Sequence, residues 1–288
     1  MSYLIGVDGG GTGCRVVVAN EAGDVLGRAK GGPANIATNL TKSRENILGA
    51  VNDAFAVAGL DTAEIQSSTA VLGLAGSNLG DYRAQLEPTL PFARADIISD
   101  AETTLVGAIG EADGCIAAIG TGSVYGRRDE YGFTQLGGWG FLLGDDGSGA
   151  RLGRDFLHLA ILAYDGLQPH SPLTREILDE YNGSPRDLIE LAMKFTPRDF
   201  GQFAPRIVKA SKTGDENAEA LMAKHTEIVR KSIDAIGFDP NKDFCMLGGL
   251  GPTYLDRLDD KYQNASHPPI GNALDGAVIL AKQLLAKS

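Results

Sequence analysis

The first carboxylate of the chain, Asp8, ends an apolar run and stands directly before a glycine-rich turn. Residues 9–13 read Gly-Gly-Gly-Thr-Gly, and a second apolar run begins at Cys14. Glycines leave no side chain to hold a ligand away from the backbone, so the N–H groups of such a turn can face a phosphate group. A carboxylate beside this turn could serve a divalent metal ion. By itself the stretch is equally compatible with an ordinary glycine-rich hairpin.

Two better-known phosphate-binding patterns do not fit this stretch. A dinucleotide fingerprint requires G-x-G-x-x-G at the start of a helix, whereas the β-branched residues Val16–Val18 indicate a strand here. A Walker-type loop requires Gly-Lys-Ser or Gly-Lys-Thr after the glycines, and no glycine cluster of this chain has that continuation. The remaining functional interpretation is a hairpin whose tip binds phosphate.

The same arrangement occurs again in the second half of the chain. Strand-like runs from Tyr3 and from Cys115 each begin a predicted three-stranded meander, and residues 120–123 of the second meander read Gly-Thr-Gly-Ser. A third glycine-rich turn, residues 248–251, follows the predicted buried strand 244–247. This duplication predicts two related α/β domains that offer turns to the same ligand.

Predicted helices separate and follow these strands. Apolar residues at helical spacing predict a helix over 41–58 with Gly59 as its stop, and the longest helix over 216–236 with Gly237 as its stop. A last helix, 273–286, is expected to return to the first domain. The predicted domains are residues 1–108 plus 271–288, and residues 109–270 with helical insertions.

Composition limits the classes of partner. The 288 residues are 43% hydrophobic, enough for two cores, and carry a formal net charge of −11. That charge argues against nucleic acid and anionic membranes, although one nucleotide can bind where backbone dipoles and a cation supply local positive field. The cysteines, at 14, 115 and 245, form no C-x-x-C pair and no disulfide framework. With no leader pattern and no long apolar run, a soluble cytoplasmic protein is expected.

Three segments together resemble a known superfamily. Asp8–Gly13, Ile119–Ser123 and Leu247–Gly251 are similar, in order, to the phosphate 1, phosphate 2 and adenosine motifs of the actin, hsp70 and sugar kinase superfamily. Within it, the chain resembles the BadF/BadG/BcrA/BcrD-type ATPases, and in particular N-acetylglucosamine kinases. The most specific segment is GGWGFLLGDDGSG at 137–149, which differs from the pattern of those kinases at Asp146, where glutamate is usual. The resemblance implies two duplicated actin-like (ribonuclease H-like) α/β domains with a central nucleotide and sugar cleft.

The resemblance also implies a reaction and its site. The γ-phosphate of ATP would pass to the 6-hydroxyl of N-acetylglucosamine, or of glucosamine as the alternative, and a homodimer is left open. Asp8 would hold Mg²⁺ through water, and Asp100 would be the base that takes the hydroxyl proton. The residues implied to bind ATP are Gly10, Gly11, Thr12, Gly13, Thr121, Gly122, Ser123, Gly248, Gly249 and Gly251. The residues implied to contact the sugar are Asn35, Asp100, Gly138, Trp139 and Asp145.

Residue types alone favour simpler interpretations at several of these positions. Asp100 precedes a predicted helix and is well suited to cap it, as is Asp146 before Gly147-Ser148. A lone tryptophan such as Trp139 is more often a core residue. Arg15 is interpreted as an exposed strand charge rather than a phosphate ligand.

Two other classes of function remain as alternatives. The same family contains ATPase subunits that drive electron transfer into reductases and dehydratases through a cysteine-ligated iron–sulfur cluster. The cysteines here lie within predicted strands rather than in a glycine-rich cluster loop, which argues against that role. A non-catalytic sugar sensor is the other alternative, and the retention of Asp8, Asp100 and all three turns argues against it.

Overall fold

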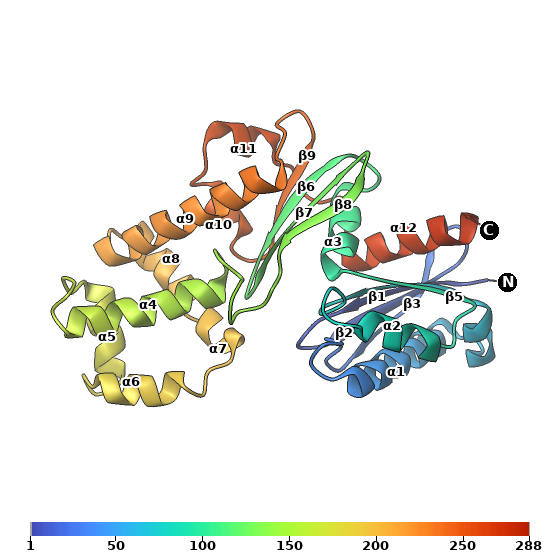
Figure 1. Ribbon diagram of the computed structural model, residues 1–288, viewed down its shortest axis with the longest axis horizontal. Coiled ribbons are helices and arrows are strands. Elements are labelled where there is room, and N and C mark those ends of the chain that lie inside the picture. Colours follow the sequence, from blue (N-terminus) through green and yellow to red (C-terminus); the bar gives the residue numbers. More distant parts are fainter. Residues whose placement is uncertain (1, 288) are drawn as a thin grey trace. The chain divides into compact units, whose positions relative to one another are not determined.

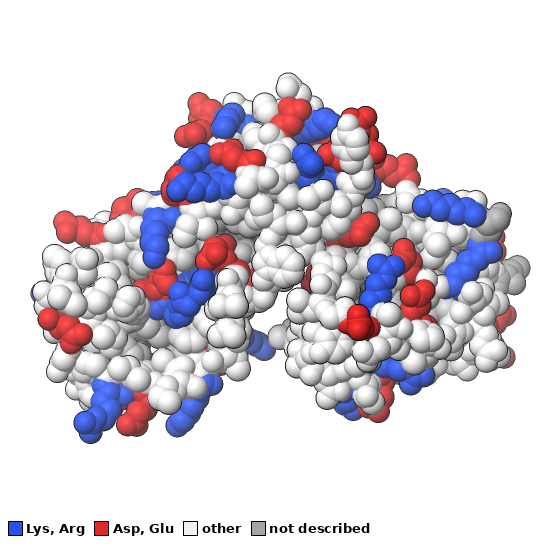
Figure 2. Space-filling model, in the orientation of Figure 1, with Lys and Arg blue, Asp and Glu red and all other residues white. Residues whose placement is uncertain are grey.

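The computed structural model describes residues 2–287, which divide into two compact units, each with its own sheet (Figure 1). Unit 1 comprises residues 2–113, 128–133 and 268–287, and unit 2 comprises residues 114–127 and 134–267. None of the helices within residues 2–287 has the length and apolar character needed to cross a lipid bilayer. On the face shown in Figure 2, acidic and basic side chains are interspersed.

The sheet of unit 1 has the strand order β3-β2-β1-β4-β5. The first three strands are antiparallel neighbours, whereas β4 is parallel to both β1 and β5. This confirms the predicted amino-terminal meander and brings the carboxyl ends of β1, β4 and β5 to one edge of the sheet. The strands are β1 (Leu4–Gly9), β2 (Cys14–Ala19), β3 (Val25–Gly31), β4 (Thr69–Leu74) and β5 (Arg94–Ile98).

Alternation along these strands gives unit 1 an apolar layer on each face of its sheet. Ile5 and its same-face neighbours pack against α1 (Leu40–Ala58), whereas Leu4 packs against α12 (Ala273–Ala286). Gly276 lets α12 approach α3 (Asp100–Ile109) closely, because a Cβ there would lie 2.0 Å from the carbonyl oxygen of Thr103. The shorter helices are η1 (Thr62–Ser67), α2 (Tyr82–Leu86) and η2 (Glu87–Thr89).

The sheet of unit 2 has the order β8-β7-β6-β9, in which β6 and β9 are parallel. The strands are β6 (Gly114–Ile119), β7 (Ser123–Asp129), β8 (Gly132–Gly137) and β9 (Asp243–Leu247), which confirms the predicted second meander. Helices make up most of the rest of this unit (Figure 1). They are α4 (Gly149–Tyr164), α5 (Pro172–Glu180), α6 (Pro185–Ala192), α7 (Pro197–Gly201), α8 (Ala204–Lys212), α9 (Glu216–Ile236), α10 (Gly251–Leu255) and α11 (Asp260–Ala265).

Helix ends follow the predicted stop signals. Gly59 and Gly237 adopt left-handed backbone angles, with φ of 69° and 92°, at the carboxyl ends of α1 and α9. Glycine pays little steric penalty in that conformation, so it ends the helix and its N–H satisfies the last carbonyls. The longest predicted helix, 216–236, is confirmed over its whole length.

Candidate functional site

The turn between β1 and β2 is closed by its own backbone. The N–H of Gly10 donates to the carbonyl of Gly13 at 2.9 Å, and the carbonyl of Gly10 accepts from the N–H of Ala34 at 2.9 Å. Thr12 at the tip is exposed. An open hollow beside the turn is lined by Asp8, Gly10, Thr12 and Gly13, together with Cys14, Arg15, Lys30 and Gly31.

Two glycines of this turn are not required by the fold. A Cβ on Gly11 would meet no atom within 4 Å, and a Cβ on Gly10 would come no closer than 3.8 Å to the carbonyl oxygen of Gly13. Neither residue has a positive φ. Because neither packing nor backbone angle demands glycine, what the missing side chains provide is bare backbone facing open space, as a phosphate site needs.

In unit 2, the two other glycine-rich turns follow the neighbouring parallel strands β6 and β9. The N–H of Leu250 donates to the carbonyl of Ile119 at 3.1 Å, so the two turns are bonded to each other. Gly248 has a φ of 80°, and a Cβ there would lie 2.3 Å from the carbonyl oxygen of Ile119, so the fold itself requires this glycine. By contrast, a Cβ on Gly120 or Gly249 would meet nothing within 4 Å. Each of the three turns therefore presents at least one glycine that packing does not explain.

Asp8 is paired with a basic side chain that sequence reasoning did not assign to it. The two residues are direct partners across the β1–β2 ladder, and the guanidinium of Arg15 donates to Asp8 Oδ2 through Nε at 2.9 Å and through Nη2. The Asp8 side chain is 18% exposed. Lys30 on β3 is in turn the ladder partner of Arg15. The sequence held a signal for this pair, because an acidic and a basic residue at matching positions on either side of a hairpin turn become partners across the ladder.

Asp100 does not cap its helix, so the capping interpretation is wrong. The N-cap of α3 is Ser99, whose Oγ accepts from the N–H of Ala101 at 3.2 Å, and Asp100 is the first helical residue. Burial raises the pKa of the Asp100 carboxyl, and the nearby charge of Asp8 raises it further. Hydrogen bonds from the backbone and from Ser99 offset part of this effect. A half-buried carboxyl with a raised pKa, near a second carboxylate, is suited to accept a proton.

Asn35 lies in the loop that is bonded to the same turn. Its Oδ1 accepts from the N–H groups of Ala37 at 3.0 Å and Thr38 at 3.2 Å, and its carbonyl accepts from the Ser43 hydroxyl at 3.0 Å. Its neighbour Ala34 makes the bond to Gly10 described above. Unit 1 thus brings Asp8, the turn 10–13, Asn35 and Asp100 to one region of its surface.

In unit 2, the loop between β8 and α4 is exposed and largely apolar. Trp139 is 63% exposed, which rules out the interpretation of a core residue, and Leu142 and Leu143 are 85% and 87% exposed. The loop is fixed at its base, where Gly138 donates to the carbonyl of Ser123 at 3.1 Å. Phe141 anchors its middle by stacking on Phe200 with ring centroids 5.2 Å apart.

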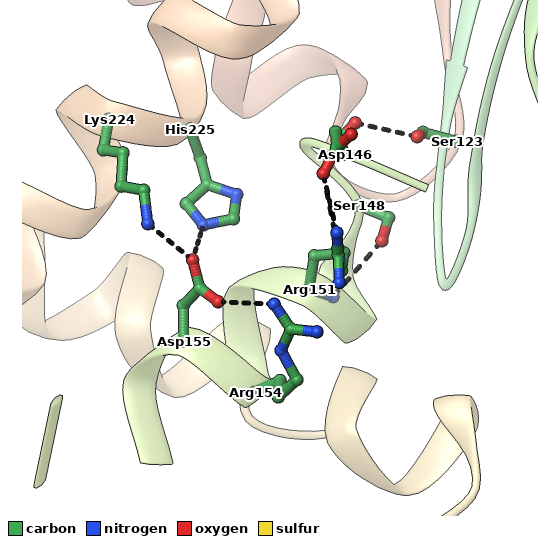
Figure 3. Close-up of polar contacts among 8 residues, drawn as sticks. All are labelled: Ser123, Asp146, Ser148, Arg151, Arg154, Asp155, Lys224 and His225. Carbon is green, nitrogen blue, oxygen red and sulfur yellow. Dashed lines mark hydrogen bonds and ion pairs between the residues drawn. The ribbon is translucent and has the colours of Figure 1, made fainter. Parts of the chain in front are cut away.

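The two aspartates that end this loop have different surroundings. The N-cap of α4 is Ser148, so the interpretation of Asp146 as the cap is wrong. Asp146 instead accepts from the Arg151 guanidinium at 3.1 and 3.3 Å, and its carbonyl accepts from the Ser123 hydroxyl at 2.8 Å (Figure 3). Asp145 has a positive φ of 58°, and burial raises the pKa of its carboxyl.

A second charged cluster in Figure 3 ties helix α4 to helix α9. The Asp155 carboxylate on α4 hydrogen-bonds Lys224 Nζ at 2.8 Å, Nε2 of the buried His225 at 3.3 Å and the Arg154 guanidinium at 3.2 Å. Burial raises the pKa of Asp155, but the hydrogen bonds from His225 and Lys224 outweigh burial and hold it far below its usual range. These ion pairs therefore link helix α4 to helix α9.

Among residues 2–287, no three His, Cys, Asp or Glu side chains group closely enough to hold a metal.

Comparisons with known proteins cover nearly the whole chain. In an alignment of 286 positions that covers 98% of this chain and 96% of the relative, the chain is 30% identical to the glucosamine kinase GspK of Vibrio cholerae. It is 29% identical, over 98% of this chain and 99% of the relative, to the N-acetylmuramic acid/N-acetylglucosamine kinase of Clostridium acetobutylicum. A solved Chromobacterium violaceum protein, named as a candidate N-acetylglucosamine kinase, superposes with a TM-score of 0.87 at 34% identity. That alignment covers 98% of this chain and 99% of the other.

The match to a family model is equally extensive. The model of the BadF/BadG/BcrA/BcrD ATPase family matches residues 5–273, a range that includes all three glycine-rich turns. Together with the structural likeness, this confirms the predicted fold class, two sheet-and-helix units of the actin-like type. The chain belongs to the BadF/BadG/BcrA/BcrD ATPase family.

Proposed function

We propose that this protein is an ATP-dependent kinase that transfers the γ-phosphate of ATP to the 6-hydroxyl of N-acetylglucosamine. The observation that carries the proposal is Asp100, a half-buried carboxyl with a raised pKa that lies at the start of helix α3, near the charge of Asp8. The relatives from Vibrio cholerae and Clostridium acetobutylicum are named as amino sugar kinases.

Asp100 supplies the base of the reaction. Phosphoryl transfer needs the acceptor hydroxyl in line with the γ-phosphate and needs little covalent help from the protein. A carboxylate that accepts the hydroxyl proton contributes about 10²–10⁴-fold to such a reaction. The raised pKa of Asp100 brings its proton affinity closer to that task than the affinity of an exposed aspartate.

ATP would bind along the glycine-rich turns. The N–H groups of Gly10, Gly11, Thr12 and Gly13 receive phosphate oxygens in this proposal, as do those of Thr121, Gly122 and Ser123. Gly248, Gly249 and Gly251 let the adenosine lie against the backbone. The support is the open space at Gly10, Gly11, Gly120 and Gly249, where a Cβ would meet no close neighbour. ATP use is also what the family's description as ATPases implies.

Asp8 would hold Mg²⁺, through water, beside those phosphates. Mg²⁺ usually takes one or two carboxylates and completes its shell with water and substrate phosphates, so a single carboxylate beside a phosphate turn fits it. The bound ion would neutralise charge on the transferring phosphoryl group. Arg15 balances the charge of Asp8 in the structure and would have to yield part of that contact.

The sugar would be held by side chains from the set implied by the resemblance. Asn35 keeps its amide nitrogen free of acceptors among residues 2–287, so it can donate to a sugar oxygen. The exposed ring of Trp139, flanked by Gly138 and Gly140, offers an apolar wall. Asp145 would accept from vicinal hydroxyls. The predicted domains, residues 1–108 plus 271–288 and residues 109–270, and a cytoplasmic location belong to the same proposal, which leaves a homodimer open.

The adjacent glycines 248 and 249 give a matched test of the nucleotide site. Gly249→Ala should change the free energy of unfolding by no more than about 0.5 kcal/mol, because its Cβ meets nothing, and should weaken binding of an ATP analogue. Gly248→Ala should destabilise by about 1–3 kcal/mol because of its positive φ and the clash with Ile119. Urea denaturation and calorimetric titration measure the two effects. Normal nucleotide binding by Gly249→Ala would remove this glycine from the site.

A panel of hexoses and hexosamines, with ADP release as the readout, tests the proposed function directly. We expect release with N-acetylglucosamine, weaker release with glucosamine, and little with sugars that lack the 2-amino substituent. Fastest release with glucosamine would establish the alternative substrate, in line with the name of the Vibrio relative. Sugar binding without ADP release would favour the sensor, and absorbance near 400 nm in anaerobically purified protein would favour an electron-transfer ATPase.

A further inference from the structure

We infer that Asp145 has a second role, in which its carboxylate guards the phosphate turn of unit 2 until sugar binds. The inference rests on the proposed function, since it takes residues 121–123 as phosphate ligands and Asp145 as a sugar ligand. If ATP binds weakly while no sugar is present, little of it is hydrolysed by water. Asp145 would in this way favour sugar over water as the phosphate acceptor.

The position of the carboxylate carries the argument. A Cβ built on Gly122 would lie 3.0 Å from Oδ2 of Asp145 and 3.3 Å from its Cγ, so the carboxylate lies directly over this glycine. Gly122 has no positive φ. Its missing side chain therefore makes room for the Asp145 carboxylate in the sugar-free structure. The surface that would receive a phosphate group carries a negative charge.

That charge faces the donors that a phosphate would need. The backbone N–H groups of Ser123 and Gly140 lie close enough to the carboxylate to lower its pKa, against the larger effect of burial. A phosphate oxygen approaching the N–H of Ser123 meets a carboxylate of like charge in a half-buried place, where the repulsion is weakly screened. Nucleotide binding is therefore weakened as long as the carboxylate stays over the turn.

The backbone at Asp145 is held in place while its side chain can move. Its φ of 58° is uncommon for a residue other than glycine and stores strain that surrounding bonds must balance. Those bonds include Ser148 N–H to the Asp145 carbonyl at 3.0 Å and Ser123 hydroxyl to the Asp146 carbonyl at 2.8 Å. Both bonds hold the backbone, so the Asp145 side chain can rotate by itself once its carboxylate leaves the N–H groups of Ser123 and Gly140. The loop can thus stay in place while the carboxylate exchanges the turn for a sugar hydroxyl.

Linkage makes the consequence measurable. If sugar hydroxyls draw the carboxylate away from Gly122, sugar must raise nucleotide affinity, and nucleotide must raise sugar affinity by the same factor. Couplings of this kind are typically about 5–150-fold. For the wild-type protein we expect bound N-acetylglucosamine to tighten binding of a non-hydrolysable ATP analogue about tenfold.

Calorimetric titration of the full chain with that analogue and Mg²⁺, without sugar, tests the inference. Asp145→Gly removes the carboxylate and suits the positive φ, and Asp145→Asn removes only the charge. Both should bind the analogue about tenfold more tightly than wild type, and both should hydrolyse ATP faster in the absence of sugar. Asp146→Asn is the matched control. It removes a neighbouring charge that faces Arg151, and it should change sugar-free affinity by less than about twofold.

The outcomes separate the inference from the proposed function. Sugar-free affinity of Asp145→Gly and Asp145→Asn equal to that of wild type overturns the guarding role, even if the protein phosphorylates N-acetylglucosamine. An equal gain in Asp146→Asn also overturns it, because the effect would then be general to acidic charge on this loop. Tighter sugar-free binding in both Asp145 variants supports the guard, and failure of every sugar to release ADP would refute the proposed function alone.

Discussion

Asp100→Asn is expected to lower kcat by about 10²-fold or more and to leave the KM for the sugar largely unchanged. Asparagine has nearly the size of aspartate and can still hydrogen-bond a hydroxyl, but it cannot take the hydroxyl proton. Steady-state kinetics with N-acetylglucosamine and Mg²⁺-ATP measure both constants. Turnover near the wild-type value would remove Asp100 from the role of base.

The same substitution should not destabilise the protein. The folded-state pKa of Asp100 is raised, so its contribution to stability is fully present below the unfolded pKa and is lost as pH rises through the folded pKa. Burial and the nearby charge of Asp8 both disfavour the ionised form of the Asp100 carboxyl. Because the side chain of Asp100→Asn cannot ionise, Tm should stay unchanged or rise. A falling Tm would mean that lost activity reports on folding, not on chemistry.

Glu102→Gln is the matched control on the same helix. Burial raises the pKa of Glu102 as well, with Asp96 adding to the effect, while Arg83 and Arg128 counteract it. The substitution removes a half-buried carboxylate two residues from Asp100, outside the proposed site. We expect kcat within about threefold of wild type, because the substitution keeps the size of the side chain and lies outside the proposed site.

Asp8→Ala is expected to abolish use of Mg²⁺-ATP while the fold is retained. Nucleotide affinity of the wild-type protein should rise with Mg²⁺ concentration, because the ion bridges the phosphates and the carboxylate. The variant should bind nucleotide with no dependence on Mg²⁺. Titrations of an ATP analogue at several Mg²⁺ concentrations measure this, and unchanged activity would exclude Asp8 from the site.

Asp96→Ala controls for the loss of an ion pair in the same unit. Asp96 on β5 accepts from Arg83 at 2.7 Å, as Asp8 accepts from Arg15, and both pairs are partly exposed. Partly exposed ion pairs are worth about 0–1 kcal/mol, so both variants should unfold at nearly the same urea concentration. Only Asp8→Ala should lose the dependence on Mg²⁺. Equal loss in both would point to a general effect of charge on nucleotide affinity.

The sequence by itself determined the local elements and their repetition. Apolar runs interrupted by glycine-rich turns predicted both meanders, and helical spacing with a glycine stop predicted the long helix 216–236, all confirmed by the structure. These features depend on neighbours within about ten residues, which a single sequence displays. The glycine clusters located the three turns in the same way. The family resemblance named the individual site residues, and their roles are proposals.

Only the tertiary structure decided which polar side chains cap the helices and whether Trp139 is buried. Ser99, not Asp100, caps α3, and Ser148, not Asp146, caps α4, because a cap depends on one residue's backbone angles at the point where the strand or loop meets the helix. Exposure of Trp139 depends on a loop anchored through Phe141 on a distant helix.

The glycines show the same division most clearly. Residues 248 and 249 are both glycine. The fold needs the first, because a Cβ there would clash with Ile119 on the neighbouring strand, but it leaves open space at the second. The space around Gly122, filled by the carboxylate of Asp145, is likewise set by residues more than twenty positions apart. Whether a glycine serves folding or a ligand depends on what lies across from it, and only the folded chain brings those atoms together.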